Sequence, residues 1–249
     1  MRLSAPPPVV IFPGFGNDAS DYSTPLGAPL SDGFVSALGR RGMGASVVPI
    51  ARLDWLRVAG GLLDPSFVRG EGRVGGLAFG WYLRKGRAAV EEAVAKAREG
   101  EGGGGEGGDE RGGERRGGDH RALLVCHSAG GWLARGMCLL DPTWARTHVR
   151  GIVTLGSPHL PPPPEVGDPT RGSVSDVASL ATTSPLPKDI FTLSVASGRV
   201  VGESQEGKEG GGGQVEAFAF NSYKMVCGEG GVAGDGARMS RRRGCGESG

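Results

Sequence analysis

The sequence predicts an α/β fold, with a mostly parallel central sheet and helices on both faces of it. Short apolar runs alternate with longer segments of helical periodicity along the chain. Continuous apolar runs are typical of strands that are buried on both faces, as in a parallel sheet. Strands that are separated by helical crossovers favour this class over an all-β or an all-α fold.

Each expected element has its own pattern. The run VVIF at 9–12 ends at Pro13-Gly14, and the segment 77–98 places alanine and valine at helical spacing opposite Glu91 and Glu92. The expected strands are 9–12, 46–50, 123–126, 151–155 and 191–195, and the expected helices are 30–41, 77–98 and 129–140. Two further apolar segments follow at 215–220 and 223–227. We expect one α/β domain that spans residues 1–249.

Four segments are expected to lie outside the packed layers. Residues 100–118 are nearly all Gly, Glu, Asp and Arg and cannot bury enough apolar surface to order, so we expect a disordered surface insertion. Residues 202–213 form a second Gly/Glu-rich loop, and 157–187 are rich in Pro, Ser and Thr, as expected of a loop region that caps a site. The tail 237–249 shows no strand pattern and is expected to be disordered.

Composition excludes several classes of protein. The net charge of +1 argues against binding to nucleic acid, and no run approaches the 18 apolar residues of a membrane span. The four cysteines stand at no metal-ligand spacing, so we expect no metal and no cofactor. Reduced thiols and the lack of a visible signal segment favour an intracellular protein, in the cytoplasm or a plastid.

The segment CHSAGG at 126–131 predicts a nucleophile elbow, in which Ser128 stands on a tight turn between a strand and a helix. Such a turn leaves room only for small residues beside the serine, which Gly130 and Gly131 satisfy; Cys126 stands where glycine is usual. The alternative interpretation is a serine that only caps the helix, but this explains neither the paired glycines nor the Pro13-Gly14 turn.

Backbone N–H groups near Ser128 are expected to form an oxyanion hole. The N–H of Ala129 lies at the start of a helix, where the helix dipole favours negative charge. The second donor should come from the loop after the first strand, and Phe15 in PGFG at 13–16 is the expected residue.

Several segments together resemble plant and algal α/β-hydrolases of the GPI inositol-deacylase-like lipase group. They are FPGFGND at 12–18 with Asp21-Tyr22, CHSAGGWLAR at 126–135, TLGSPHLPP at 154–162, TRG at 170–172, YKMVCG at 223–228 and GDG at 234–236. The resemblance implies an α/β-hydrolase fold and hydrolysis of acyl esters by a Ser-Asp-His triad without a metal. It implies Asp235 as the triad acid, and a last strand and helix that this sequence is expected to lack.

The remaining acids and histidines leave the triad open. Asp176 and Asp189 are the alternative acids, although both are read more simply as solvated loop residues. The triad histidine should follow the acid, and no histidine follows Asp235. Of the four histidines, His120 and His148 precede their strands, and His127 should point away from its neighbour Ser128. Only His159 follows a strand on the expected active-site side, as a possible substitute base.

We therefore expect a serine hydrolase that acts on carboxylic esters of acyl or lipid type through an acyl-enzyme. Its partner would be a hydrophobic ester or lipid, with peripheral membrane contact left open. A thioesterase or acyltransferase would use the same site. The alternative is a catalytically impaired member of the fold that acts in binding, because no triad histidine is visible. We also expect that the reading frame or a splice junction is altered after Asp235; the basic residues at 238–243 are otherwise an interaction tail.

Overall fold

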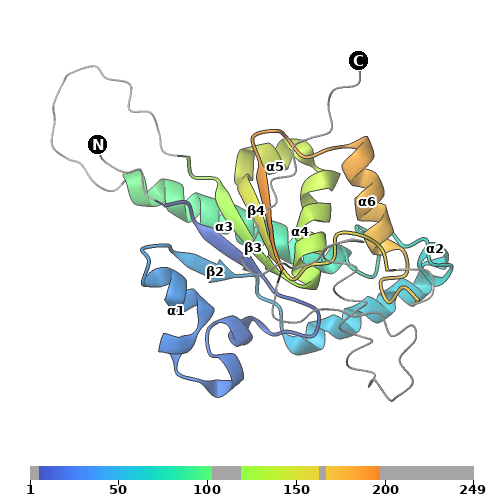
Figure 1. Ribbon diagram of the computed structural model, residues 1–249, viewed down its shortest axis with the longest axis horizontal. Coiled ribbons are helices and arrows are strands. Elements are labelled where there is room, and N and C mark those ends of the chain that lie inside the picture. The colour runs from blue at the N-terminus through green and yellow to red at the C-terminus, as the bar shows by residue number, and fades with distance from the viewer. Residues whose placement is uncertain (1–5, 103–118, 163–166, 197–249) are drawn as a thin grey trace, which may run out of the picture.

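The computed structural model describes residues 6–102, 119–162 and 167–196, which form a parallel sheet with helices on both faces (Figure 1). The five strands follow the spatial order β2-β1-β3-β4-β5, and every neighbouring pair is parallel. They are β1 (Val9–Phe12), β2 (Ala45–Val47), β3 (Ala122–His127), β4 (Val149–Leu155) and β5 (Phe191–Val195). The predicted α/β class is thus confirmed.

The larger helices connect these strands. The α-helices are α1 (Phe34–Gly39), α2 (Pro65–Val68), α3 (Gly80–Gly102), α4 (Ala129–Leu140), α5 (Pro142–His148) and α6 (Ser173–Thr183). Four segments are 3₁₀-helical: η1 (Ala19–Tyr22), η2 (Pro25–Gly27), η3 (Leu30–Asp32) and η4 (Arg52–Leu63). The helix expected over 30–41 is therefore two shorter pieces, η3 and α1, with Gly33 between them.

The two faces of the sheet are covered unequally. Residues of α3, α4 and α6 pack with alternate strand residues, such as Phe12 and Leu124, into the larger core. The opposite face holds a smaller cluster around Ile11 and Val125, against which α1 packs. Figure 1 shows α1 on one side of the strands and α4 and α6 on the other.

Two segments differ from the sequence-based expectation. Residues 173–183 lie inside the expected cap-like loop region, yet they form α6, and Val174 and Val177 are buried against the core. The Ser and Thr residues of this helix hid its apolar spacing. Helix α3 also runs on to Gly102, into the start of the expected insertion. The rest of that insertion, the loop 202–213, the segments 215–220 and 223–227 and the tail 237–249 lie outside the described residues.

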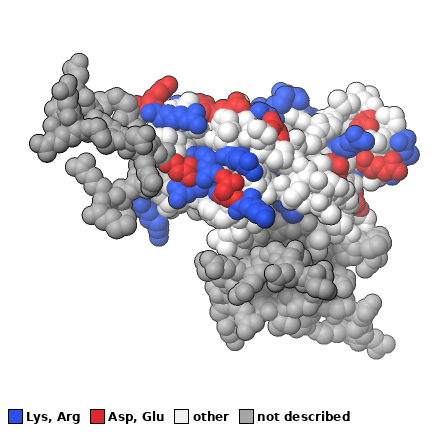
Figure 2. Space-filling view, turned by 90° about the horizontal axis from the view of Figure 1, so that it is seen from above, with Lys and Arg blue, Asp and Glu red and all other residues white. Residues whose placement is uncertain are grey.

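Acidic and basic side chains are mixed on the surface that Figure 2 shows, with no extended area of one sign. At the amino ends of the strands Arg121 contacts Asp119 at 2.9 Å and Asp189 at 2.6 Å. The charge of Arg121 is therefore balanced by neighbouring carboxylates. In the part of the chain that the structure describes, no helix is long and apolar enough to cross a membrane.

Helix α3 packs so closely on the sheet that one position admits only glycine. A Cβ on Gly86 would lie 2.6 Å from Cε1 of the fully buried Phe12 ring. We expect Gly86→Ala to lower the free energy of unfolding by about 1–3 kcal/mol, because the ring has no space to move into. Urea denaturation measures this.

Gly39→Ala is the matched control, because a Cβ at this position in α1 meets no atom within 4 Å. It should leave stability unchanged or raise it by up to about 1 kcal/mol, the gain in helix propensity. Equal losses in the two variants would contradict the tight packing of α3 on β1.

Candidate active site

Ser128 occupies the turn between β3 and α4 in a backbone conformation that few residues other than glycine adopt. Its φ is 50° and its ψ is −123°, and its N–H donates to the Leu155 carbonyl at 2.9 Å. Strained residues of this kind cluster at functional sites. Although Ser128 stands at the N-cap of α4, its side chain makes no capping hydrogen bond. Capping therefore does not explain this serine.

Three glycines surround the turn, and each is in contact with a neighbouring segment. A Cβ on Gly130 would lie 2.4 Å from the Phe12 carbonyl oxygen, and one on Gly131 would lie 2.1 Å from Ser157 Oγ. A Cβ on Gly14 would lie 3.0 Å from Ser128 Cβ. The expected need for small residues after Ser128 therefore follows from close packing. The loop after β1 has the same need at Gly14.

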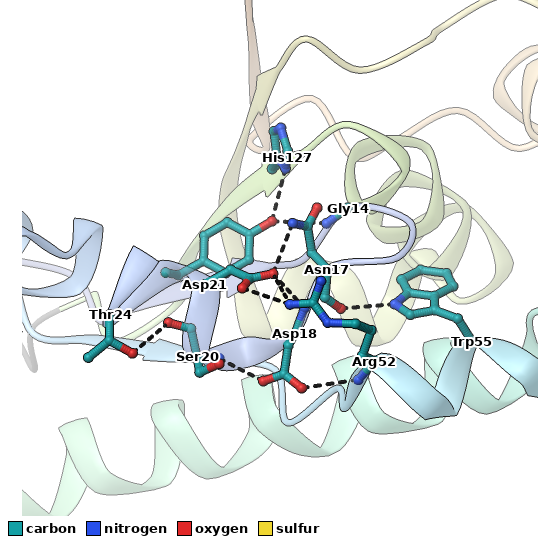
Figure 3. Close-up of polar contacts among 10 residues, drawn as sticks. Gly14, Asn17, Asp18, Ser20, Asp21, Thr24, Arg52, Trp55 and His127 are labelled. Atoms are coloured by element: carbon teal, nitrogen blue, oxygen red, sulfur yellow. Dashed lines mark hydrogen bonds and ion pairs between the residues drawn. The ribbon is translucent and has the colours of Figure 1, made fainter. Parts of the chain in front are cut away.

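A tyrosine joins that loop to the residue before the serine (Figure 3). Tyr22 Oη accepts the N–H of Gly14 at 3.0 Å and lies 2.9 Å from His127 Nδ1. Burial raises the pKa of the Tyr22 phenol, and burial lowers the pKa of the His127 imidazole. Both groups are therefore neutral near pH 7, and a hydrogen bond joins the Tyr22 hydroxyl to Nδ1.

A second set of contacts fixes the same loop to the segment after β2 (Figure 3). Asp21 accepts hydrogen bonds from the Asp18 N–H and from Asn17, and it pairs with Arg52 at 2.9 Å. Asp18 accepts the N–H of Ser20 and that of Arg52, and these bonds lower its pKa. The loop is thus held from both sides before any ligand binds.

The two expected oxyanion donors are Phe15, in the loop after β1, and Ala129, at the start of α4. The Phe15 ring is 62% exposed and packs on Trp55, with the ring centroids 4.9 Å apart. Trp55 Nε1 in turn donates to the Asn17 carbonyl at 3.0 Å. Among the described residues, neither the Phe15 N–H nor the Ala129 N–H has a hydrogen-bond partner. That these two N–H groups form an oxyanion hole stays a prediction.

A hollow of about 280 Å³ lies beside the turn, on the side of His127. Its walls combine apolar strand residues with polar residues of the loop after β1. The lining residues are Ile11, Asn17, Asp21, Tyr22, Phe34, Val125, His127 and Leu155. A small apolar hollow with a few convergent polar groups is typical of a ligand site.

His159 lies at the carboxyl ends of the strands, whereas His148 and His120 precede their strands, as expected. His159 Nε2 contacts Thr154 Oγ1 at 3.1 Å and Ser194 Oγ at 3.0 Å, at the carboxyl ends of β4 and β5. His148 Nδ1 contacts the Trp144 carbonyl at the end of α5, and His120 precedes β3. Within the described ranges, no hydrogen bond joins the Ser128 hydroxyl to a histidine.

The expectation that both alternative acids are solvated loop residues is wrong for Asp176, whereas Asp189 does lie in an exposed turn. Asp176 lies in the first turn of α6 and accepts the Val74 N–H at 2.8 Å. Asp189 precedes β5, at the opposite edge of the sheet from Ser128, and pairs with Arg121. Both carboxylates have structural partners. Asp235 lies outside the described residues.

Sequence reasoning assigned no role to Tyr22, although its hydroxyl connects two loops of the site. The Asp21-Tyr22 pair was visible only as part of the family resemblance, and nothing in its spacing indicates a contact with His127, 105 residues later. In the described residues no group of three or more His, Cys, Asp or Glu side chains could hold a metal.

One comparison with known proteins found a match. The family model described as the PGAP1-like alpha/beta domain matches residues 112–186, from before β3 to the end of α6. The matched segment includes Ser128, Ala129 and His159 but neither Phe15 nor Asp235. No curated protein matches the chain. The fold and this match together indicate an α/β fold of the hydrolase type. A plant or algal origin stays a prediction.

The buried His127 makes stability depend on pH. Burial holds its folded pKa below the 6.5 of an exposed imidazole. Between the two values the unfolded chain binds more protons, so stability is complete above about pH 6.5 and declines as the pH falls toward the folded pKa. We expect urea denaturation to show lower stability at pH 5.5 than at pH 7.5.

His127→Gln is the matching variant, because an amide can still form a hydrogen bond with the Tyr22 hydroxyl but does not titrate. The loss of stability between pH 7.5 and 5.5 should be smaller in this variant. The paired carboxylates lose their contribution only at lower pH, since their pKa values are lowered from 3.8. An unchanged pH dependence in His127→Gln would contradict the assignment.

Proposed function

We propose that this chain is a serine hydrolase of carboxylic esters, with Ser128 as its nucleophile. The observation that carries the proposal is the strained backbone of Ser128, which places a hydroxyl without a capping role at the carboxyl edge of the sheet. Strain of this kind is typical of a nucleophile elbow. The similarity of residues 112–186 to the PGAP1-like alpha/beta domain supports it.

The proposed reaction begins with attack of Ser128 Oγ on the ester carbonyl carbon. The carbonyl oxygen becomes an oxyanion, which accepts hydrogen bonds from the Phe15 and Ala129 N–H groups. The C–O bond to the alcohol then breaks, the alcohol leaves with a proton, and an acyl-enzyme remains. Water attacks this ester in turn and releases the carboxylic acid. A thioester or a second alcohol would enter the same cycle.

The serine proton needs a base. We propose Asp235 as the triad acid, from its resemblance to the acid segment of the lipase group, and His159 as the substitute base on the side of β4. The Thr154 and Ser194 hydroxyls would orient its imidazole. The acyl chain would lie in the hollow beside His127, whose walls include Ile11, Phe34 and Leu155.

The second candidate function is ligand binding by a fold that has lost its hydrolase chemistry. One observation favours it: no described histidine is hydrogen-bonded to Ser128. Loss of a triad base lowers kcat by several orders of magnitude and leaves only the rate that the oxyanion hole supports.

Covalent labelling separates the two functions. We expect a fluorophosphonate to form one adduct with the folded chain, to locate on the peptide that contains Ser128, and to form none with Ser128→Ala. Ser179→Ala, which changes an exposed serine of α6, should label like the unchanged chain. Mass spectrometry of the intact protein measures the adduct. Absence of labelling on soluble, folded protein would reject the hydrolase and favour the binding function.

A further inference from the structure

The 3₁₀-helix η4 divides its side chains into three rows, because residues three apart are aligned in this type of helix. One row, Leu53, Leu56, Ala59 and Leu62, faces solvent along its whole length. The three leucine side chains in it are 77%, 72% and 69% exposed, and Leu63 beside them is 81% exposed. A contiguous exposed apolar surface of this kind marks an interaction site.

The opposite row of η4 fixes the helix to the core. Trp55 is 6% exposed and packs edge-to-face on Trp81 and at a tilt on Tyr82 of α3, with ring centroids 5.5 and 5.4 Å away. A Cβ on Gly61 would lie 2.6 Å from the Phe67 ring. The helix therefore cannot rotate to bury its leucines without losing the aromatic contacts of Trp55. Their exposure is fixed by the fold.

The arginine side chains of η4 are exposed to solvent, whereas the carboxylates that pair with them are sheltered. The side chains of Arg52 and Arg57 are 62% and 61% exposed. Their carboxylate partners are sheltered, with 25% exposure for Asp21 and 12% for Asp54. The surface beside the leucines is thus apolar and cationic, the combination that binds the interface of a bilayer with phosphate headgroups.

Helix η4, which carries this surface, contacts the loop of the candidate active site through Trp55. The exposed Phe15 ring packs on Trp55, and Phe15 follows Gly14, which touches both Ser128 and His127. We propose that the row Leu53, Leu56, Ala59 and Leu62, with Leu63 and Phe15, docks the protein on a lipid surface. Docking in this way brings the carboxyl edge of the sheet to the bilayer. The proposal does not depend on Ser128 being a nucleophile.

A lipid surface explains these features better than another protein does. A stable protein interface buries on the order of 1,000 Å² or more, and charged residues are depleted from its centre. Here a single narrow row of leucines lies directly beside two exposed arginines on the same short helix. Because each arginine keeps its carboxylate on the inner side, the outward guanidinium groups can still contact phosphate headgroups, whereas a second copy would present guanidinium groups to them.

Vesicle binding tests the proposal. Co-sedimentation with vesicles of phosphatidylcholine that contain a minority of phosphatidylserine should pellet the protein. Leu56→Ser and Leu62→Ser should each lower the partition coefficient by about tenfold, from the loss of one partly inserted leucine. Leu30→Ser is the matched control, because Leu30 is 66% exposed on η3 and lies outside the row. It should bind like the unchanged chain.

Further measurements distinguish a lipid surface from the other partners that could cover the leucine row. Fluorophosphonate labelling in buffer without vesicles should be the same in all these variants, so failure of docking is distinguishable from failure of the proposed hydrolase. A concentration-dependent dimer that Leu56→Ser dissociates would overturn the proposal in favour of a second copy. Unchanged vesicle binding with a lower melting temperature in the leucine variants would overturn it in favour of a segment of this chain.

Discussion

The described structure depends on one constraint, which is that residue 128 holds a left-handed backbone at the junction of β3 and α4. The turn leaves no room around it: Gly14, Gly130 and Gly131 contact the serine, the end of β1 and the start of the loop after β4. This turn carries the chain directly from β3 into α4, which packs with α6 in the larger core.

At the carboxyl edge of the sheet, one set of contacts holds both the loop after β1 and helix η4. The loop after β1 is held on one side by Tyr22 and His127 and on the other by Arg52. Helix η4, which begins at Arg52, is in turn anchored by Trp55 in the aromatic part of the core. The same contacts therefore fix the loop after β1 and expose the leucine row, so the proposed chemistry and the proposed docking would share one rigid support.

The strands and the tight turn at Ser128 could be predicted because their signals are local. Val9–Phe12 is a short apolar run, Phe191–Val195 alternates apolar and polar residues, and the glycines after Ser128 have a steric meaning that the sequence alone conveys. The 3₁₀ row of η4 was missed because its period of three is neither that of an α-helix nor that of a strand. Tyr22 was missed because a hydrogen bond between residues 22 and 127 leaves no trace in spacing. Asp176 was misread, since its partner is a backbone N–H at residue 74.

The central claim is that the fold holds Ser128 for chemistry and gains no stability from its hydroxyl. Urea denaturation of Ser128→Ala tests this most directly. Replacing a serine that caps a helix by alanine lowers the stability of the protein by about 1 kcal/mol or more. Because the Ser128 side chain caps nothing, we predict a change within about 0.5 kcal/mol. A loss of about 1–2 kcal/mol, the value for a lost cap, would contradict the account.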